Sequence, residues 1–451
     1  MWLRIAHVRL IGQFDMTPPK KMDNQKSQSV QIFSKYCVVA IMFIGFIGKF
    51  SIFADGSYYL WKISSSGGLM VGPVEWNRYL SYLLTQGPLA LASDLGIDSM
   101  NLLLGIYSFG VLFVTCFFLV YFYSKTLNFY RVELLYIAIP IALVPAILVC
   151  LSTNFIGTAL LLASISVIIR YRESSAIDKF TMLSILTFQG FTGDSVICFA
   201  PGILVLIYSR FKFGGLPKSI AIYLSVVELI SVAINILSFT MRMEGVTAER
   251  ASNGALRPEN FVKNSQVMLA LAIFIFLAVA LRYSSKIKVI AFTLAVIALS
   301  INYILPIPDS HTIFNARYFH TVFLGILVFY LSVKSLNTDN SKSVEKVPTL
   351  NVLILVTFLT LSPVLKLAIQ FNSYLSEVDY IVNSSEGQIG FEEARLSQNS
   401  LNFTWDYTSP SISRIFWRDS KSGLILNYYA DIWQPVPLTG ADPMGKNIYW
   451  K

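Results

Sequence analysis

Asp55 is the acidic residue best placed to do chemistry, because it stands where a long apolar run meets a polar, aromatic stretch. A carboxylate at the mouth of a membrane cavity can act as a general base, since partial burial tunes its pKa. The alternative is an aspartate that caps a helix at a membrane boundary. The candidates behind it for lining the cavity or binding an acceptor are Tyr58, Tyr59, Trp61 and Glu75.

A second group of candidates surrounds Arg317, which precedes a late apolar run. An arginine fork suits a phosphate, because its paired N–H donors match two oxygens. The alternative is an arginine that reaches lipid headgroups. Its neighbours His311 and His320 could donate to a phosphate or be ordinary interfacial residues, and Tyr318 is a further cavity candidate.

Four more residues have two interpretations each. Asp194 follows Gly193 and is either a second acid near the cavity or a turn residue. Trp405 either stacks on a sugar ring or serves packing and membrane anchoring. Lys49 and Glu228 lie inside apolar runs, where a charge costs roughly 2.5–3.5 kcal/mol, so they should face protein or water. They could pair with each other, or they could mark an ion path.

The amino-acid composition indicates which class of fold must position these residues. Of the 451 residues, 55% are hydrophobic and 14% are charged, whereas an ordinary soluble domain is about 25% charged. This excludes a soluble globular enzyme and a disordered scaffold. The net charge of +9 is scattered between apolar blocks, so no nucleic-acid partner is expected. The chain is therefore predicted to be an all-α polytopic membrane protein in contact with a lipid bilayer.

Hydropathy predicts about eleven transmembrane helices, since a span needs roughly 17–25 mostly apolar residues. The predicted spans are 36–54, 100–123, 133–151, 154–170, 179–192, 195–210, 219–241, 265–282, 287–305, 318–334 and 349–370. The pair between 179 and 210 could be two short helices or one broken, re-entrant element.

Charge placement predicts the orientation. More than half of the 35 basic residues fall in the tail and loops that are inner if the N-terminus is cytoplasmic, which is the positive-inside pattern. The expected organisation is a cytoplasmic basic tail (1–35) with no cleavable signal, a transmembrane domain (36–370) and a small periplasmic C-terminal domain (371–451). The first periplasmic loop is 55–99, and its stretch 57–93 is expected to form one or two helices.

Cofactor chemistry is not indicated by the sequence. Three histidines are too few and too scattered for a histidine-based metal cage, and the four cysteines lie inside apolar runs with no C-x-x-C spacing. No phosphate-binding loop of the G-x-x-x-x-G-K-[ST] type is present, which argues against ATP-driven transport. We therefore expect no cofactor and no metal site.

The combined layout resembles the GT-C glycosyltransferases, which are multi-spanning enzymes that use polyprenyl-phosphate sugars. The features that carry the resemblance are the acid after span 1, the aromatic stretch behind it, the Arg317-Tyr318 pair entering a late span and the outer tail. The size and the segment from Asp55 to Trp61 look most like bacterial and phage serotype-converting O-antigen glucosyltransferases of the Gtr type. The single carboxylate at 55 departs from the acidic pair of many relatives, which puts a divalent-metal requirement in doubt.

The resemblance implies a mechanism and a location. Asp55 would deprotonate an acceptor hydroxyl, which attacks the anomeric carbon of an undecaprenyl-phosphate-linked sugar and inverts its configuration. Arg317, with Arg78 or His320, would stabilise the leaving phosphate. The acceptor would be lipid-linked O-antigen at the periplasmic face of the bacterial inner membrane. Two alternatives stay open: an O-antigen polymerase of the Wzy type, and a lipid-linked glycan flippase or secondary transporter.

Overall fold

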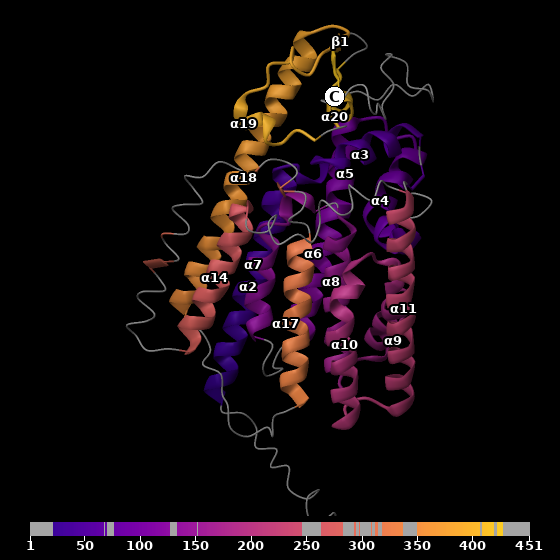
Figure 1. Ribbon diagram of the computed structural model, residues 1–451, viewed down its shortest axis with the longest axis vertical. Coiled ribbons are helices and arrows are strands. Elements are labelled where there is room, and N and C mark those ends of the chain that lie inside the picture. The colour runs from indigo at the N-terminus through magenta and orange to yellow at the C-terminus, as the bar shows by residue number, and fades with distance from the viewer. Residues whose placement is uncertain are drawn as a thin grey trace, which may run out of the picture.

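The protein is mostly helical, and its long helices run roughly parallel in one bundle in the computed structural model (Figure 1). The structure describes residues 21–66, 68–69, 76–126, 133–150, 152–245, 263–282, 293–294, 297, 308, 312–313, 318–336, 350–405, 408–418 and 422–426.

In the first half of the bundle, the predicted spans 100–123 and 154–170 closely match helices of the structure. The helices of this half are α2 (Lys21–Ile47), α3 (Asp55–Ser66), α4 (Tyr79–Asp94), α5 (Met100–Ser108), α6 (Val114–Lys125), α7 (Glu133–Leu143) and α8 (Thr153–Ile169). The short 3-10 turns η1 (Phe50–Ile52), η2 (Trp76–Arg78) and η4 (Ile147–Val149) lie between them, and the π-turn η3 (Phe109–Phe113) joins α5 to α6. The stretch 57–93 therefore contains parts of two helices, α3 and α4.

The second half contains longer helices and one small sheet. Its elements are α9 (Ala176–Thr187), the 3-10 turn η5 (Gln189–Phe191), α10 (Ser195–Lys212), α11 (Lys218–Gly245), α14 (Ser265–Arg282), α17 (Phe319–Leu336), α18 (Leu350–Ser384), β1 (Gln388–Ile389), α19 (Gln398–Leu401), α20 (Ser409–Ile415) and β2 (Leu424–Ile425). β1 and β2 pair in parallel, with Gln388 opposite Leu424.

Five helices of the described part are long and apolar enough to cross a membrane. They are Gln28–Ile47, Met100–Lys125, Ser195–Lys212, Lys218–Met241 and Leu353–Ser384, and four shorter apolar helices accompany them. The region 179–210 is not one continuous helix, because α9 ends at Thr187 and α10 begins at Ser195. The predicted span 287–305 lies almost wholly outside the described residues.

Two predicted spans end earlier than expected. The first helix, α2, stops at Ile47, so 48–54 forms a turn and not the end of a span. α7 stops at Leu143, two residues before Pro145, and a proline disfavours the helical conformation of the residue that precedes it.

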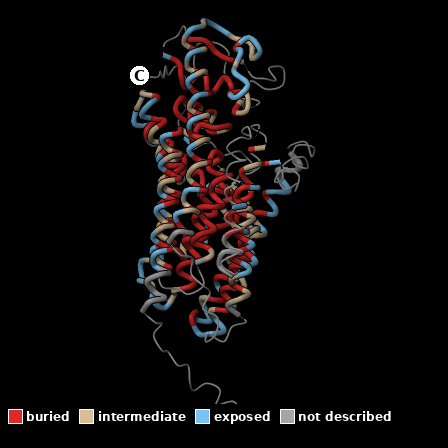
Figure 2. The backbone as a smooth tube through the Cα atoms, turned by 90° about the vertical axis from the view of Figure 1, so that its left-hand side faces the viewer, coloured by how far each residue is buried: buried red, intermediate tan, exposed pale blue. Residues whose placement is uncertain are grey.

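The core lies along the middle of the bundle (Figure 2). Every residue of α8 from Thr153 to Ile169 is buried, whereas α11 exposes much of its apolar surface. Close approach of α10 and α17 depends on small residues: a Cβ added at Gly325 would lie 2.5 Å from the carbonyl oxygen of Cys198. Small residues at a helix crossing are typical of membrane bundles.

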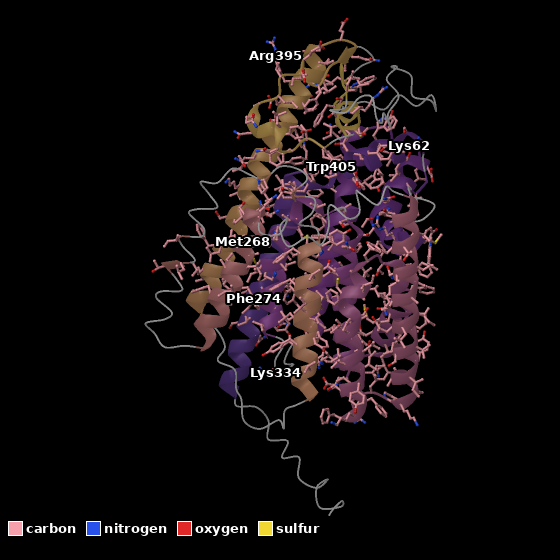
Figure 3. All side chains as sticks on the ribbon, in the orientation of Figure 1. Lys62, Met268, Phe274, Lys334, Arg395 and Trp405 are labelled. Carbon is pink, nitrogen blue, oxygen red and sulfur yellow. The ribbon has the colours of Figure 1, made fainter. Side chains whose placement is uncertain are left out.

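The described residues of the segments predicted to be inner gather at one end of the bundle, the basic end. There Lys125 pairs with Asp178 at 2.7 Å, and Arg170 donates to the carbonyl oxygen of Lys125 at 3.2 Å. Figure 3 places Lys334 toward this end, and Lys62 and Arg395 at the opposite end. That opposite end, which carries α3, is named the α3 end.

The C-terminal segment, the described residues 385–426, folds back at the α3 end. α18 is 35 residues long, and its last turns carry this segment above the bundle (Figure 1). The Phe371 ring of α18 contacts the rings of Phe50, Phe53 and Phe403, at centroid distances of 6.1, 5.9 and 5.5 Å. α20 packs against α3. The start of α3 therefore lies beside the C-terminal segment.

Candidate functional site

Asp55 is the first residue of α3 and follows an unusual turn. Lys49 and Ala54 have φ values of 55° and 50°, in the left-handed region that favours glycine. Both residues flank η1, whose three residues are buried. Strain of this kind persists only where surrounding packing enforces it, and it clusters at functional sites. The turn fixes the half-buried side chain of Asp55 at the α3 end.

The surroundings of Asp55 are aromatic. Tyr107 on α5 is buried and lies within electrostatic range of both Asp55 and Tyr82. Tyr59 contacts the rings of Tyr58 and Tyr82, at centroid distances of 6.0 and 6.1 Å.

The three aromatic candidates on α3 differ in accessibility. Trp61 is only 6% exposed, so its ring serves packing at least as much as binding. Tyr58 and Tyr59 are half-buried, and burial raises the pKa of the Tyr58 phenol. Of the three, Tyr58 and Tyr59 are therefore the better candidates for binding an acceptor substrate.

Lys49 does not pair with Glu228, so that predicted ion pair is wrong. Because α2 ends at Ile47, Lys49 lies at the α3 end, with its Nζ 5.9 Å from the centre of the Phe416 ring. Burial lowers the pKa of Lys49, and the negative charge of Asp379 partly opposes that shift. Asp379 itself binds Arg418 at 3.0 Å.

A second polar cluster brings together two of the predicted site residues. Arg78 forms an ion pair with Asp194 at 3.4 Å. Asn77 donates to Asp194 Oδ1 at 3.2 Å and to Asn235 Oδ1 at 2.8 Å, and it accepts from Ser238 at 2.8 Å. Arg78 is thus already neutralised by a carboxylate, and a bound phosphate would have to compete with that carboxylate.

The cluster continues inward along α11, where sequence reasoning recognised only Glu228. Glu228, Ser231, Asn235 and Ser238 are all buried and recur at intervals of three and four residues, which places them on one face of the helix. Gln189 of η5 donates from its Nε2 to Glu228 Oε2. The missed signal is this helical spacing of polar residues in an otherwise apolar span.

Three of the remaining candidates lie within the described residues, namely His320, Tyr318 and Trp405. His320 is fully buried at the start of α17, with Nε2 3.2 Å from the carbonyl oxygen of Asn154. Tyr318 is half-buried just before α17. Trp405 is half-buried and packs against the core where the C-terminal segment meets the bundle (Figure 3). Arg317, His311 and Glu75 lie outside the described residues.

Within the described part of the chain, no three His, Cys, Asp or Glu side chains gather closely enough to hold a metal ion. The four cysteines carry free thiols. No family of proteins, no curated protein sequence and no solved structure matches this chain.

Proposed function

We propose that the protein is an inverting glycosyltransferase of the GT-C type, which moves a sugar from undecaprenyl phosphate to lipid-linked O-antigen. Glucose is the first candidate for the sugar. The proposed setting is the bacterial inner membrane, with about eleven spans, a cytoplasmic N-terminus and a periplasmic C-terminal domain. The gathering of the basic loops at one end, opposite Asp55, supports this orientation.

The observation that carries the proposal is the placement of Asp55. It begins α3 directly after a left-handed alanine, and α20 of the C-terminal segment packs against α3. A donor with a long lipid tail stays in the bilayer, so its headgroup is met where the helices end. Asp55 lies at such a position.

The proposed reaction needs only a base and a phosphate-binding group. The Asp55 carboxylate takes the proton of the acceptor hydroxyl as that oxygen bonds to the anomeric carbon. The bond from the anomeric carbon to the phosphate oxygen breaks, and polyprenyl phosphate leaves with the electron pair. Arg317 is the first candidate for stabilising the phosphate, because Arg78 is held by Asp194 and His320 is buried.

The test is sugar addition to O-antigen in a host that supplies the matching lipid-phosphate sugar. We expect the parent chain to add a sugar and Asp55→Asn to add none. The matched control is Asp94→Asn, which removes an exposed carboxylate at the end of α4. Full activity of Asp55→Asn would overturn the mechanism, and altered chain length without a new sugar would point to a polymerase.

A secondary transporter is the second candidate, and one observation favours it. Glu228 is a buried acid on a polar helix face, next to the break between α9 and α10, and intramembrane acids commonly mark ion or proton paths. Transport of a lipid-linked glycan by vesicles that contain the protein, without any sugar transfer, would favour this function.

A further inference from the structure

The side chains of Gln189 and Glu228 form a buried pair inside the bundle. Each is 1% exposed. Gln189 lies in η5 and Glu228 in α11, and these two elements pack against each other. Gln189 Nε2 donates a hydrogen bond to Glu228 Oε2. The amide proton of Gln189 alone is therefore enough for the hydrogen bond between these two atoms.

The other two oxygen atoms of the pair have no hydrogen-bond donor between them. Oε1 of Gln189 and Oε1 of Glu228 are both buried, and neither receives a hydrogen bond from any described residue. The amide oxygen is only an acceptor, and so is every oxygen of an ionised carboxylate. Buried polar atoms in folded proteins are normally paired. A single proton on Glu228 Oε1 would supply the donor that these two oxygen atoms need.

We propose that Glu228 is held as a neutral carboxylic acid that shares its proton with Oε1 of Gln189, which makes the pair a proton-binding site inside the helix bundle. The two side chains then form a cyclic acid–amide pair: the amide N–H donates to one carboxyl oxygen, and the acid O–H donates to the amide oxygen. No bond other than O–H is made or broken, and the proton comes from water. This inference does not depend on the proposed function.

The charges around α11 do not oppose a neutral Glu228. In the described part of the chain, no basic side chain forms an ion pair with it. Arg78 of η2 is held by Asp194, and Asp178 of α9 is held by Lys125. The other ionisable residues on the elements packed against α11 are Lys179 on α9 and Cys198, Tyr208, Arg210 and Lys212 on α10.

The polar run on α11 connects this site toward the α3 end. Asn235 donates to the carbonyl oxygen of Gly190 at 3.1 Å, next to Gln189 in η5. It also accepts from Asn77, which donates to Asp194. The side chain of Asp194 is 12% exposed, so the polar run ends close to the surface. The proton site therefore lies at the deep end of a continuous polar face.

Infrared difference spectroscopy of the full chain in lipid vesicles at neutral pH tests the proposal. Subtracting the spectrum of Glu228→Gln from that of the parent should leave the carbonyl band of a protonated carboxylic acid, which shifts in deuterated water. The matched control is Asp178→Asn, because the hydrogen bond from Lys125 lowers the pKa of Asp178 to about 2 and keeps it ionised. That subtraction should leave carboxylate bands only. Carboxylate bands in the Glu228 difference would overturn the proposal.

A second variant keeps the test decisive if Glu228→Gln does not fold. Gln189→Leu removes the amide and leaves the acid in place. The acid carbonyl band should then move to higher frequency, because the acid loses the hydrogen bond from the amide. An acid band at the same frequency in parent and Gln189→Leu would show that the proton is not shared with Gln189, and would overturn the proposal.

Discussion

Asp55 and Asp194 occupy the same kind of turn but have different surroundings. Each directly follows a residue with a left-handed φ, 50° at Ala54 and 104° at Gly193, and each lies at the start of a helix. Asp194 is held by Arg78 and Asn77 within a polar cluster. Asp55 lies within electrostatic range of the buried Tyr107, on a helix that packs against the C-terminal segment.

This difference shows that a positive φ before an aspartate does not by itself determine the role of that aspartate. At Asp194 the turn uses glycine, which adopts a positive φ without strain, and the carboxylate is bound to a cation. At Asp55 the turn uses alanine, which pays a steric cost at the same kind of φ. We interpret Asp194 as a structural acid and Asp55 as the chemical one.

Asp55→Asn should produce the largest effect on activity. General-base catalysis contributes about 10²–10⁴-fold, so we expect the transfer rate to fall by at least about 100-fold. The midpoint of thermal unfolding should stay near that of the parent. Initial rates and unfolding curves of the same preparation check both expectations. If the loss of activity came with a clear fall in the midpoint of thermal unfolding, Asp55 would be a structural residue.

Asp194→Leu should show the reverse pattern, with a loss of stability. Removing one partner of this partly buried ion pair leaves the other charge without its counter-charge, and we expect a cost of about 1–3 kcal/mol. The double variant Arg78→Leu/Asp194→Leu should recover part of this loss, because no charge is then stranded. Unfolding of the four chains in a double-mutant cycle measures the coupling. Strictly additive losses would contradict an ion pair between Arg78 and Asp194.

Substitutions at the two positions with positive φ, Gly193 and Ala54, should change the stability of the fold in opposite directions. Gly193→Ala is expected to lose about 2 kcal/mol, because alanine is strained at this φ. The added Cβ would also lie 2.9 Å from Thr153 Oγ1. Ala54→Gly should stabilise the fold by up to about 1 kcal/mol. Thermal unfolding of both variants decides the matter, and a destabilised Ala54→Gly would argue against strain at the Asp55 turn.

The smallest effect is expected at the basic end, as a change in the pH dependence of stability. The hydrogen bond from Lys125 lowers the pKa of Asp178 to about 2. The ion pair between Lys125 and Asp178 therefore stabilises the fold above the pKa of an unfolded aspartate, about 3.9. This stabilisation is lost as the pH falls toward 2. Because the Lys125 side chain is 40% exposed, we expect less than about 1 kcal/mol.

Asp178→Asn checks this pH dependence. Unfolding measured from pH 5 down to pH 2 should show less acid sensitivity in Asp178→Asn than in the parent. The Asp194 variants serve as a comparison, because Asp194 lies at the other end of the bundle. An unchanged acid profile in Asp178→Asn would contradict the pairing with Lys125.

The long helices could be predicted from the sequence because long apolar runs are typical of helices that cross a membrane. The π-turn at Phe109 did not interrupt the apolar run, so hydropathy read α5 and α6 as one span. The end of α2 was missed, since Lys49 to Ala54 is itself largely apolar and its turn depends on two left-handed residues. That error also produced the wrong pairing of Lys49 with Glu228.

The contacts within the site could be predicted only in part. Arg78 and Asp194 were each recognised as candidates, but their ion pair joins residues more than one hundred positions apart, and packing alone determines it. The polar face of α11 was readable in principle, because Ser231, Asn235 and Ser238 follow Glu228 at helical spacing. Its partner Gln189 was not readable, since η5 interrupts the helical period there.

The most direct test of the central claim is sugar transfer by the purified protein in lipid vesicles. The vesicles would contain undecaprenyl-phosphate glucose and lipid-linked O-antigen, with no nucleotide. We predict that glucose moves to the acceptor with inverted anomeric configuration, and that Asp55→Asn transfers none while Asp94→Asn matches the parent. Equal transfer by parent and Asp55→Asn, or none by the folded parent, would contradict the assignment of Asp55 as the base of a glycosyltransferase.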